Sequence, residues 1–179
     1  MTKIMCPSRE EACILSIILI LILNAAGADW PDCGFQCQAG DVTVMNMWVG
    51  DAQGNPLSSC SPGGQVSAYL WAKIVNNANS PRYAVILLAD IYVNGVLKKS
   101  LYADGGLCVL DAISPKASTT RPFYSFTWSC GQTVKIRSLI LSWETAQGTS
   151  CSNALRKCSN RGTKCYAGAE TEKIGRAHV

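Results

Sequence analysis

"RYAVILLADIYVNGVLKKSLY", residues Arg82 to Tyr102, is the stretch that decides the fold of this chain. Two hydrophobic runs stand on either side of the dipeptide Asn94-Gly95. Asn-Gly between strands favours a type I′ turn, since both central residues of that turn need positive φ. The stretch therefore predicts a β-hairpin. Both faces of its first run are largely apolar, which predicts a central strand with one face in the core and the other partly covered.

The segments on both sides of this hairpin continue the β pattern. Alternation of apolar and polar residues predicts strands, whereas a helix needs apolar residues at three-to-four spacing. The strand pattern occurs in DVTVMNMWVGD (41–51), QVSAYLWAKIVNN (65–77), STTRPFYSFTW (118–128) and TVKIRSLILSW (133–143). No amphipathic helix is predicted after residue 28. The sequence therefore predicts an all-β fold, an antiparallel immunoglobulin-like β-sandwich of six to seven strands over residues 41–145.

The start of the chain has the features of an export signal. Lys3 and Arg9 supply positive charge, residues 12–23 (ACILSIILILIL) are apolar, and AAGA ending at Ala28 offers a cleavage site. A membrane-spanning helix needs roughly 20 apolar residues, so this run is short for an anchor. We predict a signal peptide over residues 1–28 and a secreted or cell-surface protein. Membrane contact is expected only through an uncleaved signal or a missing C-terminal anchor.

The cysteines predict disulfides. Removing residues 1–28 leaves an even set of eight: Cys33, Cys37, Cys60, Cys108, Cys130, Cys151, Cys158 and Cys165. In an exported chain such a set is typical of a disulfide framework, and its spacing leaves the pairing open. Zinc is the alternative, but structural zinc sites use more closely spaced cysteine pairs, often with histidine. We therefore predict four disulfides and no metal or other cofactor.

Two cysteine-bearing segments flank the predicted sandwich. Residues 29–40 form a lead-in, and residues 146–173 form a basic, disulfide-rich C-terminal extension expected to have little regular structure. Within the extension, residues 151–165 are locally basic and contain no acidic residue; their basic residues are Arg156, Lys157, Arg161 and Lys164. A solvated basic loop is the simpler interpretation, and contact with an anionic partner is the alternative. The overall net charge of +4 gives no general sign of nucleic-acid binding, and no nucleic-acid partner is expected.

The order of several motifs resembles a known family. An opening strand is followed by GGQVSAYLWAKIVNNANSP, LLADIYVNGVL, DAISPKASTTRPFYSFTW and GQTVKIRSLILSW. Over Asp41 to Trp143 this order is similar to the cell-adhesion-related domain of bacteria and archaea. The resemblance implies an immunoglobulin-like fold in a prokaryotic surface protein that acts as a spacer or adhesion module, and it implies no catalytic residues. The eight cysteines and the segment SCSNALRKCSNRGTKC depart from the family pattern.

The only histidine, His178, lies in the closing stretch IGRAHV. One reading frame of a widely used sequencing adapter encodes these six residues, so residues 174–179 are predicted to be an artefact. Without His178 the remaining sequence has no histidine, which removes Ser-His-Asp and Cys-His catalysis. We predict no catalytic residues and no enzymatic activity.

Carboxylates offer the remaining route to catalysis. Asp90 lies in a predicted strand, and Asp104 and Asp111 flank Cys108 in a predicted loop. A glycosidase pair needs two carboxyl groups about 5 to 10 Å apart in a cleft, which no spacing here indicates. Asp90 is expected to face a base such as Lys73 or Arg137 across the sheet. A small hydrolase using Asp90 or Asp111 is the minor alternative.

Aromatic residues give a binding alternative. If the even positions of residues 65–73 face the core, Tyr69 and Trp71 share the outer face, where flat rings could stack on a sugar. Packing against neighbouring strands explains the same pair and is favoured. The sequence therefore predicts a secreted or cell-surface structural or adhesion module, with a carbohydrate-binding module as the alternative. The expected partner is a surface protein, a glycan or a second copy of the chain.

Overall fold

The computed structural model describes residues 35–57, 61, 63–154 and 164–168. Several sequence predictions concern residues outside these ranges. They are the signal peptide (1–28), the closing stretch with His178 (174–179), and Cys33, Cys60, Arg156, Lys157, Cys158 and Arg161. None of the helices in the described residues has the length and hydropathy of a membrane-spanning segment.

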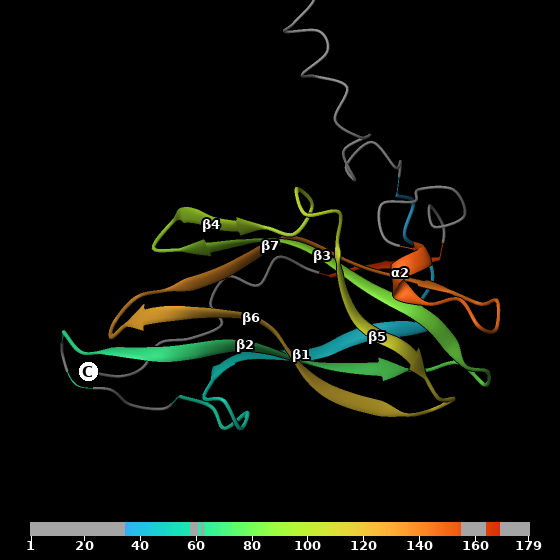
Figure 1. The fold of residues 1–179 in the computed structure, drawn as a ribbon, viewed down its shortest axis with the longest axis horizontal. Helices are drawn as coiled ribbons and strands as arrows, with labels where there is room; N and C mark the ends of the chain where they lie inside the picture. The colour runs from blue at the N-terminus through green and yellow to red at the C-terminus, as the bar shows by residue number, and fades with distance from the viewer. Residues whose placement is uncertain (1–34, 58–60, 62, 155–163, 169–179) are drawn as a thin grey trace, which may run out of the picture.

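Two antiparallel sheets pack face to face, as the sequence predicts (Figure 1). The three-stranded sheet has the order β1 (Val42–Gly50), β2 (Gln65–Asn76), β6 (Ser118–Ser129). The five-stranded sheet has the order β4 (Val96–Ser100), β3 (Arg82–Val93), β7 (Val134–Glu144), β8 (Cys165–Ala167), and β5 (Leu107–Ile113) also pairs with β3. The fold is therefore an all-β sandwich.

The predicted hairpin is the centre of the five-stranded sheet. Asn94 and Gly95 have φ angles of 49° and 78°, the left-handed conformations that a type I′ turn needs. β3 pairs with β7 along one side, and with β5 and then β4 along the other. Every residue from Ala84 to Ala89 is buried, so both faces of β3 are covered along this part of the strand. The prediction of a central strand with one face in the core and the other partly covered is confirmed.

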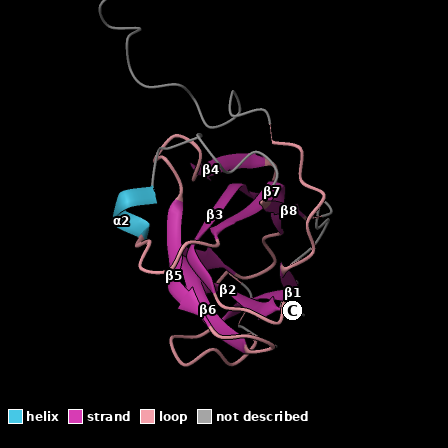
Figure 2. Ribbon diagram, turned by 90° about the vertical axis from the view of Figure 1, so that its right-hand side faces the viewer, coloured by secondary structure: helices cyan, strands magenta, loops and turns pink. Residues whose placement is uncertain are grey.

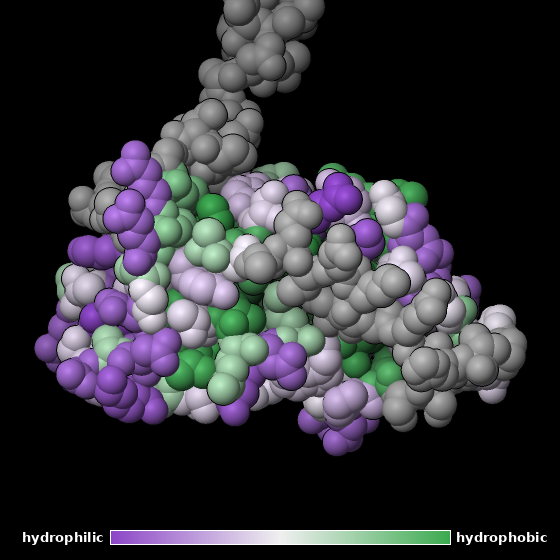
Figure 3. Space-filling model, turned by 180° about the vertical axis from the view of Figure 1, so that it is seen from behind, coloured by the Kyte–Doolittle hydropathy of each residue, from purple (hydrophilic) through white to green (hydrophobic). Residues whose placement is uncertain are grey.

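The core lies between the sheets, where side chains alternate along each strand. On β2 the inward residues Ala68, Leu70, Ala72 and Ile74 are buried, and the residues between them face outward. Trp128 of β6 and Trp143 of β7 are fully buried, the largest side chains of this core. Seen from behind, hydrophobic side chains lie in the middle of the described surface, and hydrophilic ones gather at the end on the left (Figure 3).

The outer face of the five-stranded sheet is covered by segments that the sequence analysis left irregular. A one-turn helix, α2 (Cys151–Ala154), lies outside β5 and β3 (Figure 2). Cys151 forms a small buried cluster with Ala84 and Ile86 of β3, and Cys108 of β5 packs against it. This contact explains why the outer face of β3 is apolar.

Seven strands, β1 to β7, lie within residues 41–145, in agreement with the six or seven predicted there, and β8 of the extension joins the five-stranded sheet as an eighth. Two predictions about the cysteine-rich parts need correction. Cys108 and Asp111 lie on β5, not in a loop. The extension is not wholly irregular, since α2 and β8 belong to it. Neither β5 nor β8 was identified from the sequence, because these strands are short and lack clear alternation. Disulfides from Cys108 of β5 and Cys165 of β8 hold them in place.

Several edge strands carry features that discourage pairing with another chain. β1 has a β-bulge between Val44 and Asn46, and β6 contains Pro122 at a second bulge. β4 carries Lys98 and Lys99. Bulges, prolines and lysines are common means of blocking edge-to-edge association. These features make the edges of β1, β4 and β6 poor sites for edge-to-edge association.

Candidate functional site

Two disulfides fasten the flanking segments to the sandwich. Cys37 of the lead-in is bonded to Cys165 of β8, with a Cα–Cα distance of 4.7 Å and a sequence separation of 128. Cys108 of β5 is bonded to Cys151 of α2, with a sequence separation of 43. Cys130 is also disulfide-bonded. The chain is therefore a disulfide-stabilised module, and such bonds are typical of an oxidising environment.

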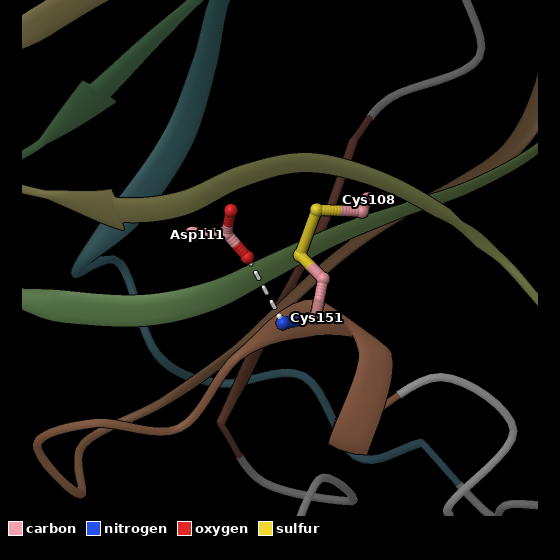
Figure 4. Close-up of side chains that lie close together, drawn as sticks. All are labelled: Cys108, Asp111 and Cys151. Carbon is pink, nitrogen blue, oxygen red and sulfur yellow. Dashed lines mark hydrogen bonds between the residues drawn. A yellow bond between two sulfur atoms is a disulfide. The ribbon is translucent and has the colours of Figure 1, made fainter.

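The second disulfide has a carboxylate beside it. The backbone N–H of Cys151 donates to Oδ1 of Asp111 at 3.2 Å (Figure 4). The side chains of Cys108, Asp111 and Cys151 are close enough together to suggest a metal site. However, a metal-binding cysteine must be a free thiolate, and both sulfurs are used in the disulfide. Asp111 therefore fixes the start of α2, and the cluster has a structural role.

Tyr69 and Trp71 share the outer face of the three-stranded sheet, but Trp71 has a closer aromatic neighbour. The register pairs Trp71 with Trp48 of β1. The two rings are stacked, with their centroids 6.4 Å apart and an interplanar angle of 11°. Both indole N–H groups donate to the loop that follows β1: Trp71 to the Asp51 carbonyl and Trp48 to the Gly54 carbonyl, each at 2.9 Å. The tryptophans are thus held by the loop.

The loop also passes close to the Trp71 ring at Gly54. A Cβ added at Gly54 would lie 3.5 Å from three atoms of the ring, so a side chain at this position would touch the ring. Asp51 orders the loop by accepting hydrogen bonds from the backbone N–H groups of Gln53 and Asn55 and from the Asn55 side chain. These bonds, chiefly the one from the Asn55 side chain, lower the pKa of Asp51. The geometry favours packing as the role of Trp71.

Of the four basic residues in residues 151–165, Lys164 alone is described. Its Nζ donates to the Thr145 hydroxyl at 3.2 Å on the exposed surface. This contact is with a neutral hydroxyl group.

A hollow of about 560 Å³ opens on the outer face of the five-stranded sheet. Three segments meet there: the lead-in, the end of β4 with the turn after it, and the middle of β3 and β7. Its lining consists of Phe35, Gln36, Asp90, Ser100, Tyr102, Ser138 and Ile140. It therefore combines a carboxylate, hydroxyl and amide groups, and aromatic and aliphatic surface.

Asp90 is the charged residue of this hollow. It lies opposite Ser100 of β4 on one side and Arg137 of β7 on the other, so Arg137 is its cross-strand neighbour as expected. The Arg137 guanidinium, however, lies over the Tyr92 ring, 4.9 Å from its centroid. Within the described residues the half-buried Asp90 carboxylate makes no hydrogen bond or ion pair. It is available to a ligand.

Tyr102 and Ser138 are joined across the hollow. The Tyr102 hydroxyl donates to the Ser138 backbone carbonyl. Ser138 has a φ of 52°, an uncommon value for a residue other than glycine, and it lies where the pairing of β3 with β7 shifts register. Bulges of this kind redirect side chains and are frequent beside functional sites. Burial, and secondly the charge of Asp90, raises the pKa of Tyr102 to about 12.

Replacing Asp90 with asparagine should lower the pKa of Tyr102, because it removes a negative charge that opposes phenolate formation. Phenolate absorbance of the native protein would show the change, and Tyr102→Phe identifies the transition.

The free energy of unfolding should depend on pH through the same ionisation of Tyr102. The unfolded tyrosine ionises near its usual value of 10.0 and the folded one near 12, so the contribution of Tyr102 is complete below pH 10 and disappears between these values.

Asp104→Asn is the matched control, because Asp104 is close in sequence but pairs with Lys99 at 2.6 Å. That variant should leave the Tyr102 transition in place. An Asp90→Asn variant with an unchanged transition would show that Asp90 exerts no effect on Tyr102.

No protein-family model, curated protein or solved structure matches this chain. A proposal for its function therefore rests on the sequence and on the geometry of the described residues. Sequence reasoning identified Asp90 as a sheet residue but missed the other residues of the hollow. Serines and a tyrosine near strand ends are common, and only the tertiary fold brings them together with the lead-in.

Proposed function

We propose that this chain is an exported, non-enzymatic structural or adhesion module. Its partner is a surface protein, a glycan or another copy of the chain. The export signal predicted for residues 1–28 and the disulfides support a secreted or cell-surface location. The two-sheet architecture is compatible with the resemblance to the cell-adhesion-related domain, and an immunoglobulin-like assignment is part of this proposal.

The Cys37–Cys165 bond is the observation that carries the proposal. It joins a residue before β1 to a residue in the last strand, so nearly the whole sandwich lies within one covalent loop. Tension applied to the chain outside residues 37–165 passes across this bond, whose two Cα atoms are 4.7 Å apart. The sheets between are shielded from that tension. Such an arrangement suits a module that must keep its shape and length outside the cell.

Single-molecule pulling tests this role. The oxidised chain, held between two reference domains, should show no extension from residues 37–165. After reduction, unfolding should add about 420 to 460 Å, the contour length of the 128 residue steps at 3.3–3.6 Å each. Tension reaches the sheets only after the Cys37–Cys165 bond has been reduced.

A Cys108→Ala, Cys151→Ala variant is the control. Its missing bond lies inside the larger loop, so the oxidised variant should stay as short as the parent. If the oxidised parent lengthened as much as the reduced protein, the proposed mechanical role would be wrong.

The carbohydrate-binding alternative through Tyr69 and Trp71 has less support. Trp71 is stacked on Trp48 and its N–H is bonded to the Asp51 carbonyl, so the ring already has partners within the protein. Loss of glycan binding in a Trp71→Ala variant would be needed to prefer that alternative.

A further inference from the structure

We infer that the hollow around Asp90 binds a neutral, hydroxyl-rich ligand of one or two sugar rings. This inference rests on the proposed function, because it names a glycan as the partner of the module. It places the glycan on the five-stranded sheet, on the opposite side of the molecule from Tyr69 and Trp71.

The hydrogen-bonding groups of the hollow suit a sugar. The Asp90 carboxylate accepts only, and the Tyr102 oxygen is left to accept because its hydrogen is donated to Ser138. The side chains of Gln36, Ser100 and Ser138 can both donate and accept, and none of them has a hydrogen bond within the described residues. A sugar hydroxyl also does both. Adjacent hydroxyls can therefore donate to Asp90 while accepting from a serine or from Gln36.

Charge argues against an ionic ligand. An ammonium group has donors alone, so it would leave the donors of Gln36, Ser100 and Ser138 unmatched. The Asp90 charge is also partly offset by Arg137 on the neighbouring strand. An anion would be repelled by Asp90 itself. A neutral ligand satisfies the most groups with the fewest conflicts.

Size and surface agree with this choice. The volume of about 560 Å³ lies within the range of ordinary small-ligand sites, about 300–1,000 Å³. The aromatic rings of Phe35 and Tyr102 and the side chain of Ile140 provide apolar surface for the C–H face of a sugar ring. The unusual φ of Ser138 is a further feature of functional sites, where strained backbone is concentrated.

Titration calorimetry on the oxidised full chain tests the inference. The probes are five neutral disaccharides (maltose, cellobiose, lactose, chitobiose and mannobiose), with the diamine cadaverine as the ionic comparison. At least one disaccharide should bind, and cadaverine should not. Asp90→Asn should weaken that binding about tenfold or more, because it replaces charge-assisted hydrogen bonds. Tyr102→Phe should weaken it less, since it keeps the ring and loses one acceptor.

Ser125→Ala, on the exposed face of β6, is the matched control and should bind as the parent does. Thermal unfolding of each variant shows whether it is folded. The inference is overturned if no disaccharide binds, if cadaverine alone binds, if a folded Asp90→Asn variant binds unchanged, or if only Trp71→Ala removes binding. A negative result in calorimetry leaves the pulling result untouched, so failure of the ligand site and failure of the structural role are distinguishable.

Discussion

Replacing Cys37 and Cys165 together with alanine should lower the free energy of unfolding by about 5 kcal/mol. The bond closes a loop with a sequence separation of 128, and a closed loop of this length removes many conformations from the unfolded chain. A typical domain is stable by about 5–15 kcal/mol, so the loss is a large part of the total. Urea unfolding of the parent and the variant measures this loss of free energy, in buffer that contains neither oxidant nor reductant.

The Cys108→Ala, Cys151→Ala variant provides a comparison within the same protein. Its loop has a sequence separation of 43, which corresponds to about 4 kcal/mol. Both variants should therefore be much less stable than the parent. A Cys37→Ala, Cys165→Ala variant as stable as the parent would mean that the bond does not restrain the unfolded chain.

Trp143→Ala should cost about 3–5 kcal/mol, the second large effect, because the side chain is fully buried between the sheets. Trp143→Phe should cost much less. The Trp143 Nε1–H is buried and has no hydrogen-bond partner among the described residues, so phenylalanine removes an unfavourable group along with part of the ring. Urea unfolding of the two variants measures the difference.

Trp128→Phe is the matched control for that comparison. Trp128 is equally buried, but its Nε1–H donates to the Gln132 carbonyl at 3.1 Å. Phenylalanine there loses both ring volume and a hydrogen bond. Trp128→Phe should therefore destabilise the protein more than Trp143→Phe does, and the reverse order would contradict the role given to the unpaired N–H.

The sequence was sufficient for the parts of the fold that depend on local chemistry. Asn94-Gly95 specifies its turn by itself, because few other residues tolerate both φ values. The alternation in β2 predicts which of its residues enter the core, since a strand with one buried face has a period of two. The doubly apolar run of β3 predicted a covered outer face without showing what covers it.

The remaining features depend on contacts between distant segments. β8 has three residues, too few for a pattern, and it is placed by the bond from Cys165 to Cys37. Trp71 was matched with Tyr69 on its own strand, but strand pairing brings Trp48 beside it. The hollow around Asp90 joins residues from the lead-in, β4 and β7, which sequence spacing does not relate.

Peptide mapping of the unreduced protein tests the central claim most directly. Digestion followed by mass spectrometry identifies which cysteines are joined. We predict one linked pair containing Cys37 and Cys165 and another containing Cys108 and Cys151. Free thiols at these positions, or Cys37 joined to a cysteine other than Cys165, would contradict the account of a sandwich closed by its own disulfide.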